Sequence, residues 1–228
     1  LILGLINRAI ENPANFDAPP YMATLVEHDE VIAVSMRTPP HNVLLSTIAP
    51  EHVEAVVALL IEDYQATYGT VPGVLGEKSV SKYFADQWTA RTGQTFVHEM
   101  KERIYQLEVV QSVNDVAGHW RVANEQDRDL ITRWFDGFQR DALGKTSDAD
   151  QLDALFERYV MADHELLIWE DGGHPVSMVG ISGVSPNGAR VGAVYTPPQH
   201  RRKGYASAVV AVSTPRSLDS GKQYCFLY

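Results

Sequence analysis

The sequence predicts a mixed α/β protein in which mostly antiparallel sheets are flanked by helices. Runs rich in β-branched residues alternate with amphipathic runs of helical period along the chain. Hydrophobic residues make up 45% of the 228 positions, which is enough to supply a core. The same order of strands, helix and strand occurs twice. We therefore expect two tandem halves, 1–114 and 115–228.

The first half is predicted to hold a short helix, a run of three strands, two further helices and a last strand. His28-Asp29-Glu30 and Pro39-Pro40 are typical turn sequences and separate the three strands. The helix at 50–68 has an apolar face of six residues and ends before Gly69. The predicted helices are 1–10, 50–68 and 77–91, and the predicted strands are 21–27, 31–36, 42–47 and 95–110.

The second half is predicted to start with a strand and two helices, followed by three strands, a loop, a helix and a strand. Asn124 is a good helix N-cap, and Asp127 stands at the capping-box position. Pro215 is predicted to kink or break the last helix. The predicted strands are 120–123, 165–169, 176–184, 189–195 and 222–228, and the predicted helices are 124–143, 148–161 and 203–220.

Composition excludes several classes of protein. A formal net charge of -10 disfavours nucleic acid and anionic membranes as partners. The apolar runs fall far short of the ~20 residues of a membrane-spanning helix. Cys225 is the single cysteine, so no intrachain disulfide can form, and a cytoplasmic location fits best. The chain begins at a leucine and stops at Tyr228 in an apolar run, so we expect a longer gene product.

The segment that carries chemistry lies between the strand at 189–195 and the last helix. Gly204 lets backbone amides approach an anion, and the small Ala206 does not block that approach. The following helix directs its unpaired N–H groups and partial positive charge into the same space. Arg201, Arg202 and Lys203 add formal positive charge to an acidic protein. This combination predicts a phosphate-binding loop.

Two prolines precede this loop and predict an opening in the sheet. Pro197 and Pro198 cannot donate ladder hydrogen bonds, so they separate the strand end from its neighbour. The backbone groups of Val194 and Thr196 are then free to pair with an amide-containing ligand. A pantetheine arm is such a ligand and a plain nucleotide is not.

The pattern Arg201-x-x-Gly204-x-Ala206 after a strand and a proline resembles the pyrophosphate signature of the GNAT superfamily of acyl-CoA-dependent N-acetyltransferases. The order of elements across 120–228 is similar to the GNAT fold as far as its fifth strand. The segment is also similar to a subgroup with a degenerate N-terminal GNAT-like half and an FR47-like C-terminal domain. The resemblance implies acetyl-CoA as co-substrate and these binding residues: Val194, Tyr195, Thr196, Arg201, Arg202, Lys203, Gly204, Tyr205 and Ala206.

The first half departs from this pattern at the equivalent place. Ile48-Ala49-Pro50-Glu51-His52 has neither the glycine nor a basic lysine or arginine, and Glu51 would repel a pyrophosphate. We therefore expect the second half alone to bind CoA. The family's fourth helix, whose tyrosine often protonates the leaving thiolate, would follow Tyr228. The catalytic acid and base are thus unassigned, although Glu165, Glu170 and His174 are near in sequence.

These features together predict an N-acetyltransferase that moves an acetyl group directly to a primary amine, carried by a small molecule or a peptide. The competing hypothesis is a regulatory module that binds acyl-CoA without turnover. Charge gives a slight preference for small cationic amines. The histidines show no metal-ligand spacing, so no metal is predicted. Assembly into homodimers is left open.

Overall fold

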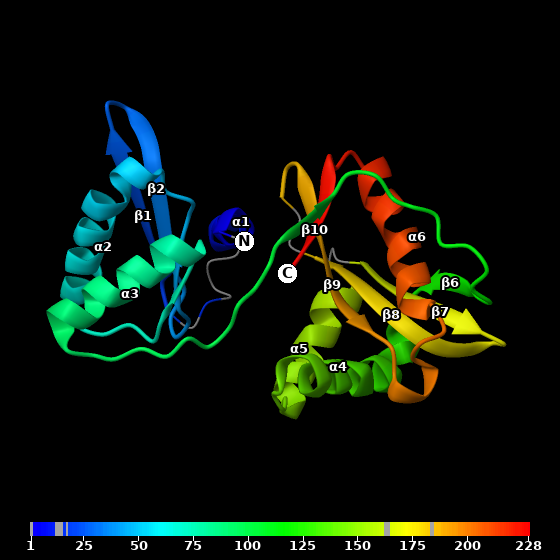
Figure 1. The fold of residues 1–228 in the computed structure, drawn as a ribbon. Coiled ribbons are helices and arrows are strands. Elements are labelled where there is room, and N and C mark those ends of the chain that lie inside the picture. The colour runs from blue at the N-terminus through cyan, green and yellow to red at the C-terminus, as the bar shows by residue number, and fades with distance from the viewer. Residues whose placement is uncertain (1, 12–15, 17, 162–164, 183–184) are drawn as a thin grey trace. The chain divides into compact units, whose positions relative to one another are not determined.

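The computed structural model describes residues 2–11, 16, 18–161, 165–182 and 185–228, and it confirms the mixed α/β class. The chain divides into two compact units, Leu1–Lys101 and Glu102–Tyr228, and each has a sheet of its own (Figure 1). The first sheet has the strand order β1-β2-β3-β4, and the second has the order β5-β10-β9-β8-β7-β6.

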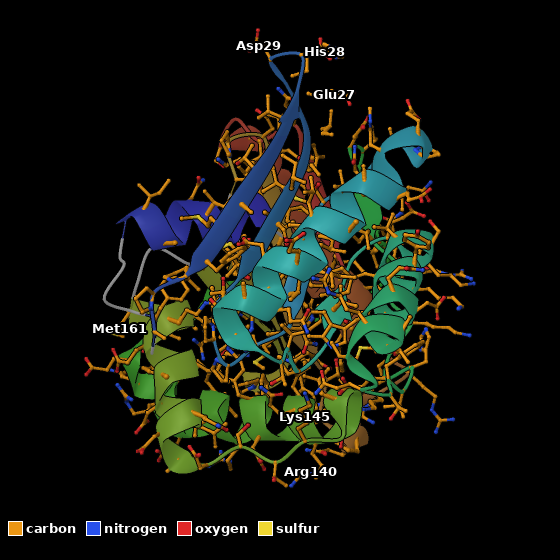
Figure 2. The ribbon with its side chains drawn as sticks, turned by 90° about the vertical axis from the view of Figure 1, so that its left-hand side faces the viewer. Glu27, His28, Asp29, Arg140, Lys145 and Met161 are labelled. Carbon is orange, nitrogen blue, oxygen red and sulfur yellow. The ribbon has the colours of Figure 1, made fainter. Side chains whose placement is uncertain are left out.

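The first unit packs two helices on one face of its sheet. Its elements are α1 (Ile2–Glu11), β1 (Tyr21–Glu27), β2 (Glu30–Arg37), β3 (Val43–Leu45), α2 (Val53–Tyr68), β4 (Val74–Leu75) and α3 (Lys78–Thr92). His28 and Asp29 form the two-residue turn between β1 and β2, at the tip of the hairpin in Figure 2. Both have positive φ, 47° and 66°, as the turn type favoured in two-residue hairpins requires.

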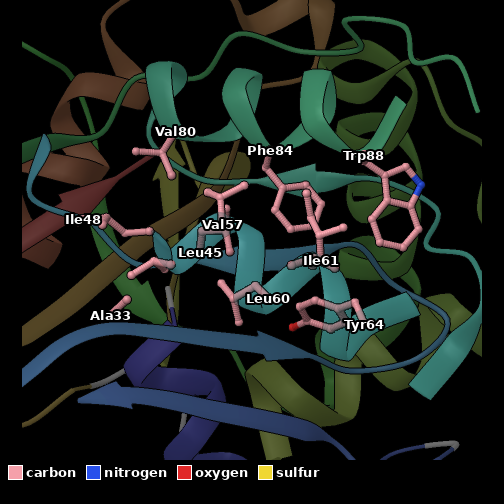
Figure 3. Close-up of a cluster of buried hydrophobic side chains, with 12 residues drawn as sticks. Ala33, Leu45, Ile48, Val57, Leu60, Ile61, Tyr64, Val80, Phe84 and Trp88 are labelled. Carbon is pink, nitrogen blue, oxygen red and sulfur yellow. The ribbon is translucent and has the colours of Figure 1, made fainter. Parts of the chain in front are cut away.

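The core of the first unit lies between α2, α3 and the sheet (Figure 3). The rings of Phe84 and Trp88 stack at a centroid distance of 5.9 Å. Tyr64 is fully buried, and its hydroxyl lies 2.8 Å from the hydroxyl of Ser35, so the polar end of this large side chain is satisfied.

The second unit covers both faces of its sheet. Its elements are β5 (Tyr105–Leu107), β6 (His119–Val122), α4 (Arg128–Leu143), α5 (Ala149–Phe156), a π-helical turn (Glu157–Met161), β7 (Glu165–Asp171), β8 (His174–Ser182), β9 (Gly188–Tyr195), α6 (Tyr205–Asp219) and β10 (Tyr224–Leu227). Helix α6 covers one face, and α4 with α5 covers the other (Figure 1). Two separate apolar cores result.

The predicted capping box is confirmed. The Asn124 side chain accepts a hydrogen bond from the backbone N–H of Gln126, at 2.9 Å, and the Asp127 carboxylate accepts one from the backbone N–H of Asn124, at 3.0 Å. The box caps a short 3-10 turn, Glu125–Asp127, that leads directly into α4. This start was predictable because every group in it lies within three residues.

Two local predictions were wrong, one of them in part. The strand expected at 95–110 is reduced to β5, Tyr105–Leu107, and it pairs antiparallel with β10 in the sheet of the second unit. Pro215 does not break the last helix, because α6 continues through it to Asp219. One turn before Pro215, the Val210 carbonyl accepts hydrogen bonds from the hydroxyls of Ser213 and Thr214. None of the helices described is long and apolar enough to cross a bilayer.

Candidate functional site

A cavity of about 490 Å³ lies where β9 ends and α6 begins. Eight of the nine predicted binding residues line it, and Lys203 alone does not. The predicted residues in the lining are Val194, Tyr195, Thr196, Arg201, Arg202, Gly204, Tyr205 and Ala206. Residues that the sequence did not indicate also contribute: Phe138, Asp141 and Ala142 from α4, together with His200 and Ser207.

The loop before α6 presents a row of free backbone donors. Arg202 and Gly204 have positive φ, 63° and 86°, and Gly204 is the residue before the first turn of the helix. The N–H of Ala208 donates to the Gly204 carbonyl at 2.9 Å, which starts the helical pattern. The backbone N–H groups from Arg202 to Ser207 donate a hydrogen bond to no acceptor in the described part of the chain. Such a concave row of amides at a helix start suits an anion.

Gly204 has two reasons to be glycine. Its φ of 86° is strained for any residue with a side chain. A Cβ at this position would also lie 2.9 Å from Cγ2 of Val116, on the segment before β6. The glycine therefore serves close packing of the loop as well as access for a ligand.

Arg201 holds the loop in place. Its Nη2 lies 2.5 Å from Oδ2 of Asp141 on α4, and its Nε donates to the Thr196 carbonyl at 2.9 Å. The negative charge of Asp141 offsets the charge of Arg201 inside the cavity. Arg202 and Lys203 have no ion pair among the described residues, so they supply the uncompensated positive charge of the loop.

The side chains of the two tyrosines in the motif, Tyr195 and Tyr205, mainly contact other parts of the protein. Tyr205 is 5% exposed, and its hydroxyl donates to Asp171; that bond, with burial, raises the pKa of Tyr205. It therefore contributes its backbone N–H to the cavity. The ring of Tyr195 packs 6.4 Å from Trp134, and its hydroxyl end lies where a Cβ on Gly137 would stand.

The end of β9 separates from β10. The residue pairs between these parallel strands run from Gly188 to Arg190. On the other side, the register with β8 shifts after Gly192, and Ala193 takes a positive φ of 48°. This geometry is that of a β-bulge, which bends a strand and re-aims its side chains. The segment 191–196 therefore has an edge facing away from β8 that no described residue of β10 occupies.

None of the catalytic candidates from the sequence lines the cavity. Glu165 pairs with Arg216 at 2.5 Å, and Glu170 lies 2.7 Å from Nε of Arg121. His174 is an exposed residue at the start of β8. Cys225 is buried beneath α6, and burial raises the pKa of its thiol, which makes it a poor nucleophile. The described residues contain no cluster of side chains that could hold a metal ion.

Comparisons with known proteins give one family match and several similar folds. Residues 128–226 match the family model described as the acetyltransferase (GNAT) family. A GCN5-related N-acetyltransferase from Kribbella flavida aligns over 99% of this chain and 85% of its own, with a TM-score of 0.50 and 14% identity. A search of curated proteins finds no match.

Two further solved structures are similar to about half of the chain. One is a predicted acetyltransferase with acetyl-CoA from Clostridium acetobutylicum. It is 16% identical, the alignment covers 48% of this chain and 79% of the other, and the TM-score is 0.41. The other is a ribosomal-protein-alanine N-acetyltransferase from Brucella melitensis, with 20% identity, 49% and 79% coverage and a TM-score of 0.40. The residues that the family model matches all lie in the second unit.

Proposed function

We propose that the second unit works as its family match implies: it binds acetyl-CoA in the cavity at the start of α6 and transfers the acetyl group directly to a primary amine. The observation that carries this proposal is the row of N–H groups from Arg202 to Ser207, for which the described part of the chain holds no acceptor. The residues that we assign to acetyl-CoA are those predicted from the sequence, with the side chains of Arg201 and Tyr205 given supporting roles.

The loop suits a pyrophosphate in charge as well as in hydrogen bonding. Donors at a helix N-terminus satisfy phosphate oxygens, and the partial positive charge of the helix end adds to the attraction. Arg202 and Lys203 are exposed and unpaired among the described residues, so they are available to a polyanion. In a chain of net charge -10, this concentration of positive charge favours a ligand with phosphates.

The pantetheine arm would lie along the free edge of β9. The amide groups of this arm can pair with the backbone of Val194 and Thr196, as an added strand would. Arg201 already donates to the Thr196 carbonyl, and that oxygen keeps a second lone pair for a ligand. The role of the bulge at Ala193 would then be to hold this edge open.

The reaction that we propose needs no covalent enzyme intermediate. The amine nitrogen, after losing a proton, attacks the thioester carbonyl carbon, the C–S bond breaks, and the CoA thiolate takes up a proton. The chain's residues orient the two substrates beside the edge of β9. A nucleophilic cysteine is unnecessary, which agrees with the burial of Cys225.

We also propose that the first unit is a GNAT-like half that has lost its phosphate loop. In both units three antiparallel strands are followed by a helix and then by a strand parallel to the third: β1-β2-β3-α2-β4 and β7-β8-β9-α6-β10. At the start of α2, however, Pro50 has no N–H and Glu51 is acidic. That helix start opposes an anion, so we assign acetyl-CoA to the second unit alone.

The test of this function combines binding with turnover on the whole chain. We expect calorimetry to show saturable binding of acetyl-CoA, and a thiol assay to show CoA release when a suitable amine is added. If the protein binds acetyl-CoA but no amine tested causes CoA release, the result would favour the regulatory module. Failure of the wild-type protein to bind would contradict the proposal.

A change at Asp141 should strengthen binding. Asp141→Asn removes the negative charge that faces Arg201 in the cavity but keeps a hydrogen-bond acceptor for the guanidinium. Because both groups are partly exposed, we expect a gain in acetyl-CoA affinity of only about threefold. Calorimetry at low salt measures it. Weaker binding by the variant would show that the ion pair matters more for holding the loop than for its charge.

A further inference from the structure

The face of β9 opposite α6 carries an arginine that the proposed acetyl-CoA site does not use. Ala189 and Val191 pack in the core beneath α6, so the alternation of a strand directs Arg190 and Gly192 to the other face. There they meet Tyr159 of the π-helical turn. A Cβ on Gly192 would have the Arg190 Cζ and the Tyr159 hydroxyl as its nearest neighbours, each 3.8 Å away.

Arg190 lacks a carboxylate partner among the described residues. Its Cζ lies 4.1 Å from the centre of the Tyr228 ring, and its Nε is buried with no hydrogen-bond partner among the described residues. Arg158 stands beside it, with Cζ 5.6 Å from the Tyr159 ring centre, and it has no ion pair among the described residues either. A buried guanidinium nitrogen without an acceptor is costly, and it points to a missing acceptor.

Among the described residues, the acidic side chain that acts on Tyr228 is Glu102. Burial raises the pKa of Tyr228, Arg190 and Arg158 lower it, and Glu102 raises it, so all three charges surround this ring. Glu102 is exposed and forms no ion pair with either arginine. Among the described residues, the two arginine charges that act on Tyr228 thus outnumber the one carboxylate. We call Arg158, Arg190, Tyr159, Tyr228 and Gly192 the arginine cluster.

Gly192 is not required by the fold. Its φ lies outside the left-handed region, and an added Cβ would make ordinary contacts only. Its partner across the strands, Gly180, is different, because a Cβ there would lie 2.5 Å from the ring of Tyr159. Packing accounts for Gly180 but leaves Gly192 unexplained. The missing side chain leaves space directly beside the Arg190 guanidinium.

We infer that the arginine cluster binds the carboxylate of the acceptor, so that the acceptor is an amino acid and not a polycationic amine. This inference rests on the proposed function, since it places the acceptor beside the proposed acetyl-CoA site. The cluster precedes Val194, which lines that cavity, and it lies on β9 where β10 leaves that strand. Two arginines repel a polyamine and attract a carboxylate, which Arg can bind through two parallel hydrogen bonds. The inference replaces the preference for cationic amines that net charge alone suggested.

The test compares each amino acid with the amine left when its carboxylate is removed, for example phenylalanine with phenethylamine and lysine with cadaverine. CoA release by the whole chain gives kcat/KM for both members of each pair. We expect the wild type to favour the amino acid by about tenfold or more, the value of a hydrogen-bonded charge pair. Arg190→Gln should bring this ratio close to one, chiefly through KM of the amino acid.

Gly192→Ala provides a second variant that the packing allows. We expect it to match the wild type in thermal unfolding and to raise KM for amino acids, because its methyl group takes the space beside Arg190. A wild type that uses the decarboxylated amines equally well or better would overturn the inference and leave the acetyltransferase proposal intact. If no amine causes CoA release, or if acetyl-CoA does not bind, both the inference and the acetyltransferase proposal are overturned.

Discussion

Reversing the two unpaired charges of the loop, in Arg202→Glu/Lys203→Glu, should weaken acetyl-CoA binding about a hundredfold or more, because each position changes from attracting a phosphate to repelling it. Stability should change little. Both side chains are exposed, and neither has an ion pair among the described residues. Arg202 already holds its positive φ with a side chain present, so glutamate adds no new backbone strain. Calorimetric titration with acetyl-CoA measures the loss.

The matched control makes the same charge change in the first unit. Lys78→Glu/Arg91→Glu places two glutamates on α3, at exposed positions outside the cavity. It should bind acetyl-CoA within about twofold of the wild type, because exposed charges that do not line the site are screened by water and salt. Equal losses in the two variants would mean that net charge, and not the loop, governs binding. The loop variant tests the charge alone better than Gly204→Glu does, since a Cβ at 204 would also contact Val116 and disturb the packing of the loop.

The second large effect concerns the stability of the second unit. Arg121 on β6 donates to both carboxylate oxygens of Asp127, at 2.6 and 2.7 Å, and to Glu170 on β7, at 2.7 Å. Asp127 is 9% exposed, so Arg121→Ala leaves a buried charge without its partner. We expect a loss of about 2–4 kcal/mol in the free energy of unfolding, measured with urea at neutral pH.

The same network predicts a pH dependence. The hydrogen bonds from Arg121, despite burial, lower the pKa of Asp127 in the folded protein. A lowered folded pKa contributes stability that is present above the unfolded value of about 3.9 and is lost as the pH falls through the folded value. The wild type should therefore lose more stability below about pH 4 than Arg121→Ala does. Parallel acid profiles for the two proteins would contradict the assignment.

Arg140 offers a contrast within the same unit. It pairs with Asp136 one helical turn away at 3.2 Å, and it lies on the outer part of α4 in Figure 2. Its side chain is 61% exposed, so Arg140→Ala should cost less than about 0.5 kcal/mol. A comparable loss of unfolding free energy in Arg121→Ala and Arg140→Ala would mean that the buried Arg121 network stabilises the unit no more than an exposed ion pair does.

Local patterns in the sequence predicted the elements of the fold, and long-range pairing decided the errors. The capping box at Asn124 was predictable because its groups are three residues apart. The alternation across 95–110 could not show that Tyr105–Leu107 alone finds a partner, because that partner, β10, lies more than a hundred residues later. Pro215 has the wrong local propensity for α6, and packing of the helix on the sheet overrides it.

The candidate site shows the same division. His200 and Ser207 adjoin the motif, so a reading of the whole loop could have included them. Asp141 is 60 residues from Arg201, and nothing in either local pattern indicates that they meet. The motif therefore overstated the charge available to a phosphate at Arg201. The sequence did not indicate the role that we propose for Arg190, because a lone arginine in a strand carries no motif; its buried Nε is the signal for that proposal.

Amide hydrogen exchange with and without acetyl-CoA tests the central claim most directly. If the second unit alone binds this ligand at the start of α6, acetyl-CoA should slow exchange at the amides of 202–207, which have no acceptor among the described residues. The amides of 51–53, at the start of α2, should not change, because Pro50 and Glu51 oppose an anion there. Unchanged exchange at 202–207, or protection at 51–53, would contradict the account.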